Sequence, residues 1–280
     1  MVQDLGCPAR SHLAAGTLLV SPVGCRSVSA SIIPGAEPYA TAGDARGALV
    51  LHGFTGNPQS MRGLALALAD AGFTVEMPLL PGHGTQIEDM LDTRWEDWSA
   101  AAEAAYTDLA ARSDGVVVVG LSMGGMLSIW LAEHHPEIAA IAVVNPLLSP
   151  PDAETIGFIQ AMLDGGDEVA PGIGSDIAME GAVEAAYPGL PLQATLSLFA
   201  AAADVEAELE SVTCPVLVFT SVEDHVVDPV SSQKLVARAK GPVEQVMLER
   251  SFHVATLDWD KDEIETRTVE FASNVFAPRP

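Results

Sequence analysis

The chain has 280 residues, of which 49% are apolar, and a formal net charge of −25 from 38 acidic and 13 basic residues. This length suits one sizeable domain, and no apolar run approaches the ~20 residues that span a bilayer. A strongly acidic surface repels phosphate backbones and anionic headgroups, so we expect no nucleic-acid binding and no stable membrane insertion.

Residues 1–32 do not share the pattern of the rest of the chain. They lack a clear period, and Gly16 and Pro22 interrupt their apolar stretch. A signal peptide with a cleavage site near residues 27–30 is one interpretation, but we favour a leader that is dispensable or disordered. Three cysteines do not make a disulfide framework, so we expect a cytoplasmic protein.

The first part of the core, residues 33–145, alternates between short apolar runs and longer amphipathic ones. This alternation is typical of strands and helices in turn. Asn57 can cap one helix, and a capping box of Thr93 and Glu96 is expected to begin another. We predict strands over residues 48–51, 73–77, 115–119 and 138–144.

Residues 146–205 interrupt this alternation with six prolines scattered among apolar residues. They are too apolar for a linker and too irregular for further strand–helix units, so we predict an inserted helical cap. The second part of the core, residues 206–280, then resumes with strands over 216–220 and 243–248 and helices over 230–239 and 261–275. The chain is therefore predicted to be an α/β protein with a mostly parallel, doubly wound sheet and ligands at the strands' C-terminal ends.

The most informative motif is Gly120-Leu121-Ser122-Met123-Gly124. The β-branched run before it predicts a strand buried on both faces, and the apolar run after it predicts a buried helix. A serine between two glycines, in a turn from strand to helix, is the context of a nucleophile elbow. We therefore predict that Ser122 is a nucleophile.

A serine hydroxyl needs a base, usually a histidine that a carboxylate orients. Among the seven histidines, His253 follows the last predicted strand, at the sheet edge toward which Ser122 should point. Three carboxylates follow the preceding strand, on Glu223, Asp224 and Asp228. We favour Asp224, because a short side chain on the first turn past a strand can orient a ring from the next loop. The other two are expected to be solvated or to cap a helix.

Negative charge on a substrate's carbonyl oxygen requires preorganised donors. One candidate is the main-chain N–H of Met123, at the start of the helix after Ser122. We assign the second donor to Phe54, in the loop that follows the strand over residues 48–51. The sequence thus predicts an oxyanion hole made of two main-chain groups.

These residues resemble the α/β-hydrolases, and among them the bacterial monoacylglycerol lipases and related carboxylesterases. In that architecture Ser, Asp and His follow one another in the chain order seen here. The likeness covers residues 34–276 and thins in the cap. The matching strings are HGFTG at 52–56, GLSMGG at 120–125, LAEHHP at 131–136, EDHVV at 223–227 and HVATLD at 253–258.

The resemblance implies the α/β-hydrolase fold with an inserted cap, and a serine esterase that acts on monoacylglycerols through an acyl-enzyme, without metal or organic cofactor. In that family a cap glutamate and nearby residues contact the glycerol moiety. By position these are Glu184 and Ile173 in the cap and Asn145 in the core; for Glu184 the alternative is a solvated helix position. No Lys or Arg occurs between Arg112 and Lys234, so we expect a small neutral ester as the partner. We expect a monomer or a homodimer.

Other functions fit the same residues. A general carboxylesterase for short- or medium-chain esters of simple alcohols would use the same triad. The fold also supports carbon–carbon bond hydrolysis and perhydrolysis, because a fold does not fix a function. The non-enzymatic alternative is a ligand-binding protein that retains hydrolase residues.

Overall fold

The computed structural model describes residues 30–172 and 174–277. The chain divides into two units, residues 1–30 and 31–280, and the fold is that of the second unit. The predicted leader, residues 1–32, lies almost entirely outside the described residues and stays a prediction.

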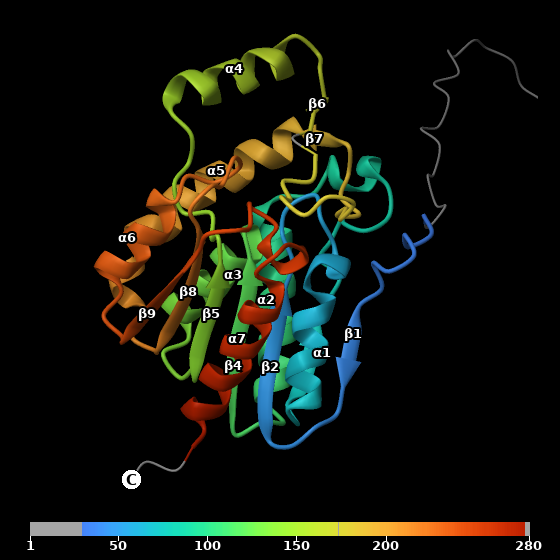
Figure 1. Cartoon of the computed structure of the whole chain (residues 1–280). Coiled ribbons are helices and arrows are strands. Elements are labelled where there is room, and N and C mark those ends of the chain that lie inside the picture. The colour runs from blue at the N-terminus through green and yellow to red at the C-terminus, as the bar shows by residue number, and fades with distance from the viewer. Residues whose placement is uncertain (1–29, 173, 278–280) are drawn as a thin grey trace, which may run out of the picture. The chain divides into compact units, whose positions relative to one another are not determined.

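A seven-stranded sheet in the order β1-β3-β2-β4-β5-β8-β9 forms the scaffold (Figure 1). All neighbouring strands are parallel except β1, which pairs antiparallel with β3. The predicted α/β class with a mostly parallel sheet is confirmed, although the sequence pattern does not predict the short edge strand β1. The strands are β1 (Tyr39–Thr41), β2 (Arg46–Leu51), β3 (Thr74–Met77), β4 (Gly115–Leu121), β5 (Ala140–Val144), β8 (Val216–Ser221) and β9 (Val243–Leu248).

Helices cover both faces of the sheet. Alternate residues of its central strands are therefore buried in two separate cores. Val116 and Val118 of β4 belong to the core that contains buried residues of α2 (Trp95–Ala110), α3 (Met123–His134) and α6 (Val230–Arg238). Val117 and Val119 face the core that contains residues of α1 (Arg62–Asp70) and α7 (Lys261–Val275). A strand buried on both faces has no polar side, which explains the continuous apolar run of β4. Short 3₁₀ helices lie at Pro58–Met61, Ile87–Met90, Leu209–Ser211 and Ala255–Leu257.

The start of α2 differs from the prediction. The predicted capping box of Thr93 and Glu96 does not form, so that prediction is wrong. The helix begins at Trp95, and the Asp97 carboxylate accepts a hydrogen bond from the Arg94 N–H at 2.8 Å. The Thr93 hydroxyl instead donates a hydrogen bond to the Met90 carbonyl, at 3.0 Å, in the turn before the helix. The chain therefore enters the helix one residue later than the pattern indicates.

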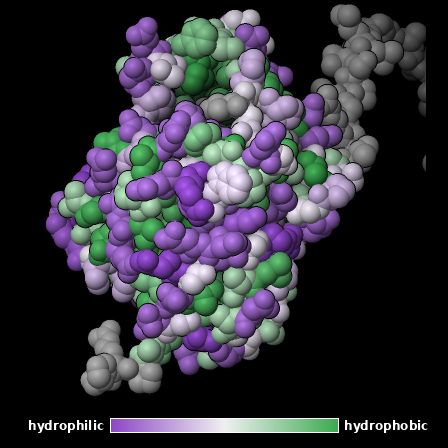
Figure 2. Space-filling model, in the orientation of Figure 1, coloured by the Kyte–Doolittle hydropathy of each residue, from purple (hydrophilic) through white to green (hydrophobic). Residues whose placement is uncertain are grey.

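Residues 146–205 contain α4 (Ala153–Asp164), the antiparallel pair β6 (Val169–Pro171) and β7 (Gly189–Pro191), and most of α5 (Leu192–Ala207). Figure 1 shows α4 and α5 lying across the end of the sheet. The face drawn in Figure 2 is mostly hydrophilic, in keeping with the net charge of −25, and hydrophobic side chains are visible over α4. Among the described residues, no helix has the length and apolar character needed to cross a membrane.

Candidate active site

Ser122 lies on a strained turn between β4 and α3, with a φ of +56°. This left-handed conformation is disfavoured for residues other than glycine and persists only where the surroundings enforce it. Here main-chain contacts enforce it: a Cβ on Gly120 would overlap the main chain of Gly124, and a Cβ on Gly124 would overlap the carbonyl of Leu51. The two glycines let strand and helix approach closely enough to leave Ser122 at the cavity surface.

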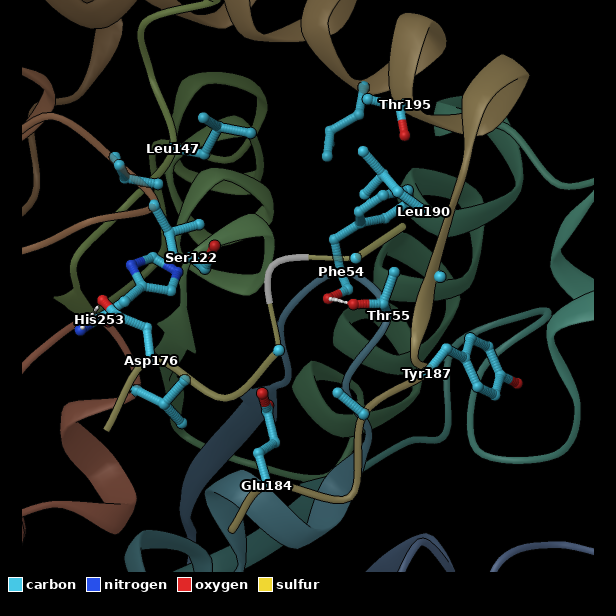
Figure 3. Close-up of a pocket in the computed structure, with 18 of the residues that line it drawn as sticks. Phe54, Thr55, Ser122, Leu147, Asp176, Glu184, Tyr187, Leu190, Thr195 and His253 are labelled. Atoms are coloured by element: carbon cyan, nitrogen blue, oxygen red, sulfur yellow. Dashed lines mark hydrogen bonds between the residues drawn. The ribbon is translucent and has the colours of Figure 1, made fainter. Parts of the chain in front are cut away.

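His253 and Asp224 form a buried pair beside this serine. Nδ1 of His253 lies 2.8 Å from Oδ2 of Asp224, and Figure 3 draws the His253 ring next to Ser122. The other carboxylate oxygen of Asp224 accepts hydrogen bonds from the main-chain N–H groups of Val226 and Val227, at 2.9 and 2.8 Å. The carboxylate is therefore fixed in one orientation, with one oxygen aimed at the ring.

The other two carboxylates of this loop have different surroundings. The Glu223 side chain is 69% exposed and lies 3.4 Å from Nε2 of His225. Asp228 accepts a hydrogen bond from the N–H of Val230 at 2.9 Å, at the start of α6. Their positions match the expected solvated and capping roles.

The predicted oxyanion loop lies against the serine. A Cβ on Gly53 would be 3.5 Å from the Cβ of Ser122, and the next residue, Phe54, lines the cavity. Met123 is the first residue of α3 and is fully buried. N–H groups in the first turn of a helix have no partner within the helix, which leaves that of Met123 available to a ligand.

His52 holds the oxyanion loop in place. Its Nδ1 lies 3.0 Å from the carbonyl of Gly53, and its Nε2 accepts a hydrogen bond from the N–H of Leu80 at 3.1 Å. Burial lowers the pKa of His52 to about 4. A neutral ring with the proton on Nδ1 satisfies both contacts, so this histidine has a structural role near the site.

Ser122 and His253 line a cavity of about 850 Å³, which is partly open to solvent. Two carboxylates, those of Asp176 and Glu184, also line it, and no Lys or Arg occurs among its described lining residues. Most of the remaining wall is apolar, as Figure 3 shows around Leu147 and Leu190. The cavity therefore combines an apolar wall with an acidic region.

Glu184 approaches the oxyanion loop from the cap. A Cβ on Gly56 would lie 2.6 Å from Oε1 of Glu184, so the glycine makes room for this carboxyl group. Burial raises the pKa of Glu184, and the nearby His253 and the Ser60 hydroxyl oppose that shift. Glu184 lies outside any helix, and its carboxyl group faces the cavity rather than solvent.

Known proteins resemble this chain in sequence and in backbone structure. Residues 43–260 match the Hydrolase_4 family model, described as serine aminopeptidase, S33. The chain belongs to this α/β-hydrolase family. It is 41% identical to a thermostable monoacylglycerol lipase from Bacillus sp. strain H-257, over 86% of this chain and 95% of the relative. A carboxylesterase from Bacillus subtilis strain 168 is 26% identical, over 84% and 95% of the two chains.

A solved structure has a similar backbone along most of this hydrolase chain. It belongs to a study of two metagenome-derived lipolytic enzymes, is 41% identical and has a TM-score of 0.83. The match covers 87% of this chain and all of that one.

One predicted substrate contact of this α/β-hydrolase, Asn145, makes its described hydrogen bonds inside the fold and stays a prediction. Asn145 is 3% exposed and is not among the described residues that line the cavity. Its Oδ1 accepts from the N–H of Ser221 at 2.8 Å, and its Nδ2 donates to the Ser221 hydroxyl at 2.9 Å and to the His253 carbonyl at 2.8 Å. The side chain thus ties β5 to β8 and to the His253 loop. The other such residue, Ile173, lies outside the described residues.

Two cavity residues, Asp176 and Tyr187, lie in a segment without a regular sequence pattern. The Asp176 carboxylate binds the His225 ring, 49 residues away, and the main-chain N–H of His253, 77 residues away. The Tyr187 hydroxyl donates a hydrogen bond to the Gly82 carbonyl at 2.8 Å. Both lie in the cap segment that has no helical or strand period. The segment also contains Glu180 and Glu184, so residue type alone does not single out Asp176.

Proposed function

We propose that this hydrolase is a serine esterase that converts monoacylglycerols to glycerol and a fatty acid, without a metal or organic cofactor. The observation that carries the proposal is that Ser122, His253 and Glu184 line one cavity whose remaining wall is mostly apolar. The 41% identity to a monoacylglycerol lipase supports the same substrate class. The proposal includes a cytoplasmic location and a monomer or homodimer.

In the first half-reaction, Ser122 Oγ attacks the ester carbonyl while Nε2 of His253 takes the hydroxyl proton. Asp224 accepts the Nδ1 hydrogen bond and stabilises the imidazolium that forms. The N–H groups of Phe54 and Met123 stabilise the oxyanion, each contributing about 3–4 kcal/mol to the transition state. The carbon–oxygen bond to glycerol then breaks, and His253 returns the proton to the leaving oxygen.

In the second half-reaction, water repeats the attack on the acyl-enzyme. His253 takes one proton of the water and returns it to Ser122 Oγ as the fatty acid leaves. The acyl chain would lie along apolar residues such as Leu147, Leu198 and Phe199, which line the cavity. A hydroxyl of the glycerol moiety would hydrogen-bond to Glu184, since the described lining of the cavity contains no Lys or Arg to pair with this carboxyl group.

The deciding experiment compares kcat/KM for a medium-chain monoacylglycerol and for the methyl ester of the same acid, with Ser122→Ala as the blank. We expect a clear preference for the glycerol ester in the wild type. Glu184→Gln should reduce that preference and leave methyl-ester turnover unchanged, because only the glycerol moiety carries free hydroxyl groups. If both wild-type rates match the blank, the esterase proposal fails.

A general carboxylesterase is the second candidate, favoured by the 26% identical carboxylesterase and by the tolerant apolar wall of the cavity. It predicts equal rates on the two esters and no selective effect of Glu184→Gln. An amino-acid anilide belongs in the same assay, because the family description names an aminopeptidase. Turnover of the anilide alone would move the proposal to peptide substrates.

A further inference from the structure

The cap segment of residues 175–187, called the strap, lines the cavity and is fixed at both ends. At its C-terminal end, Tyr187 donates its N–H to the Thr55 carbonyl at 3.0 Å, and Asn57 donates to the Ala185 carbonyl. Both partners belong to the loop that carries Phe54. At its N-terminal end, the strap is fixed by Asp176 to the opposite side of the cavity. The strap therefore connects the two halves of the candidate site.

The Asp176 carboxylate holds two loops at once. Oδ2 accepts hydrogen bonds from the main-chain N–H of His225 at 3.1 Å and of His253 at 3.0 Å. Oδ1 lies 2.8 Å from Nδ1 of His225, and the Asp176 carbonyl accepts from the N–H of Val254 at 3.0 Å. Burial raises the pKa of Asp176, but these hydrogen bonds and the His225 charge outweigh it, so the pKa lies below its usual value. The group that makes these contacts is therefore the carboxylate.

These contacts bear on the geometry of the base. His225 directly follows Asp224, so the Asp176 carboxylate fastens the main chain beside the acid to the main chain of the base. Asp224 and His253 come from loops after two different strands, β8 and β9, and their side chains meet at 2.8 Å. We propose that Asp176 is a positioning residue that sets the distance and orientation of His253 relative to Asp224. This inference rests on the proposed function, in which His253 is the base.

The other anchors of the His253 loop come from the core. Asn145 binds the His253 carbonyl, and Asp258 accepts from the N–H of Phe252 at 2.9 Å. Asp258 also accepts hydrogen bonds from the strap, from the N–H groups of Ala178 and Met179 at 2.7 and 2.9 Å. Of these three side chains, Asp176 alone comes from the cap, and it alone binds the main chain next to Asp224. A shift of the strap is thus transmitted to the base, because one carboxylate carries both contacts. In productive active sites a displacement of about 1 Å can cost about 100-fold in rate.

The test uses Asp176→Asn in the full chain, with Asp152→Asn as the matched control. Asp152 is also a cap aspartate that accepts a main-chain N–H, that of Thr155 at 2.8 Å, but it caps α4 and makes no described contact with the His253 loop. Two readouts are needed: kcat and KM on the methyl ester, and the downfield proton resonance of the Nδ1–H between His253 and Asp224. The resonance reports the geometry of the pair independently of turnover.

We expect Asp176→Asn to lower kcat by about 10-fold or more with KM changed by less than about threefold, because the base and not the substrate is displaced. The downfield resonance should shift, broaden or vanish. Asp152→Asn should retain the wild-type kinetic constants and the wild-type resonance. A wild-type kcat together with an unshifted resonance in Asp176→Asn would overturn the proposal. A loss of kcat with an unshifted resonance would overturn it as well, since the pair would be intact.

If Asp176→Asn does not fold, His225→Ala replaces it. His225 is half exposed, and its removal deletes the Oδ1 contact but leaves the main-chain contacts in place. A shifted resonance and a smaller loss of kcat are then expected, and no change in either would overturn the proposal. If the wild type hydrolyses no ester, the proposed function fails, and the resonance still decides whether Asp176 positions the His253–Asp224 pair.

Discussion

Asp224 and His253 meet in an almost dry environment, with Oδ2 2.8 Å from Nδ1 and with side chains that are 2% and 7% exposed. The carboxylate does not rotate freely, because its Oδ1 accepts two main-chain N–H groups in its own loop. The proton of the neutral imidazole is thereby held on Nδ1, and Nε2 is left as the basic atom that faces the cavity.

Asp224→Asn should therefore impair catalysis far more than stability. The Asn oxygen would keep the contacts with Val226 and Val227, so its NH₂ group would face His253 and oppose a proton on Nδ1. We expect kcat to fall by about 10³- to 10⁴-fold on the methyl ester, with little change in KM. Asp228→Asn, in the same loop, keeps its capping function and serves as the control. A kcat for Asp224→Asn within about tenfold of the wild type would contradict the assigned role.

The core of the site could be predicted because of its topology. Ser122, Asp224 and His253 follow three different strands of a parallel sheet, and such strands end at one edge. Asn145 also follows a strand, but its predicted substrate contact rests on the family resemblance and not on this topology. Asn145 has a φ of +44°, and its side chain binds Ser221, a contact that no sequence pattern encodes.

The sequence predicts the cap as an insertion but does not predict its internal contacts. Its prolines and apolar residues predict an insertion, because they break the strand–helix alternation. The side-chain contacts of Asp176 and Tyr187 depend on partners that are 49 to 105 residues away, and the segment between β6 and β7 has no period from which to infer which side faces the cavity. Long-range polar contacts of an irregular segment leave no local signature.

Asn145→Ala tests whether this residue is a structural tie or a substrate contact. The substitution leaves the N–H of Ser221 and the His253 carbonyl without their buried partner, at a cost of about 2–4 kcal/mol in the free energy of unfolding. We expect a lower midpoint in urea, a reduced kcat and a nearly unchanged KM. Asn145→Gly separates the lost hydrogen bonds from the strain of a positive φ. A raised KM with unchanged stability would support the interpretation as a substrate contact.

Substitution by alanine should change the stability of the protein in opposite directions at Gly120 and at Gly157. Gly120→Ala places a Cβ against the Gly124 main chain, which cannot move aside, so we expect a loss of more than about 3 kcal/mol or failure to fold. Gly157 lies within α4 with nothing within 4 Å of its Cβ position, and Gly157→Ala should stabilise the protein by about 0.5–1 kcal/mol. Urea unfolding measures both. A wild-type midpoint for Gly120→Ala would show that the elbow tolerates a side chain.

Glu133, on α3, gives the fold a pH dependence that is separate from catalysis. Its Oε1 is buried without a described hydrogen-bond partner. Burial and the nearby Glu208 raise the pKa of Glu133 to about 8, against a smaller opposing effect of Arg238. Between the ordinary glutamate pKa of 4.5 and about 8, the folded state therefore holds a proton that the unfolded state has released. By linkage, the free energy of unfolding falls as pH rises through this range and levels off above it.

Glu133→Gln should remove this fall, since glutamine does not ionise. We expect the variant and the wild type to unfold alike in urea near pH 4.5, and the variant to be more stable by about 1 kcal/mol or more at pH 9, because one pKa unit corresponds to about 1.4 kcal/mol. Removing any acid from a chain of charge −25 also relieves general repulsion. Glu270→Gln, at an exposed position of α7, measures that general effect. If the two variants gain equally at pH 9, the stabilisation comes from net charge and burial of Glu133 contributes nothing to it.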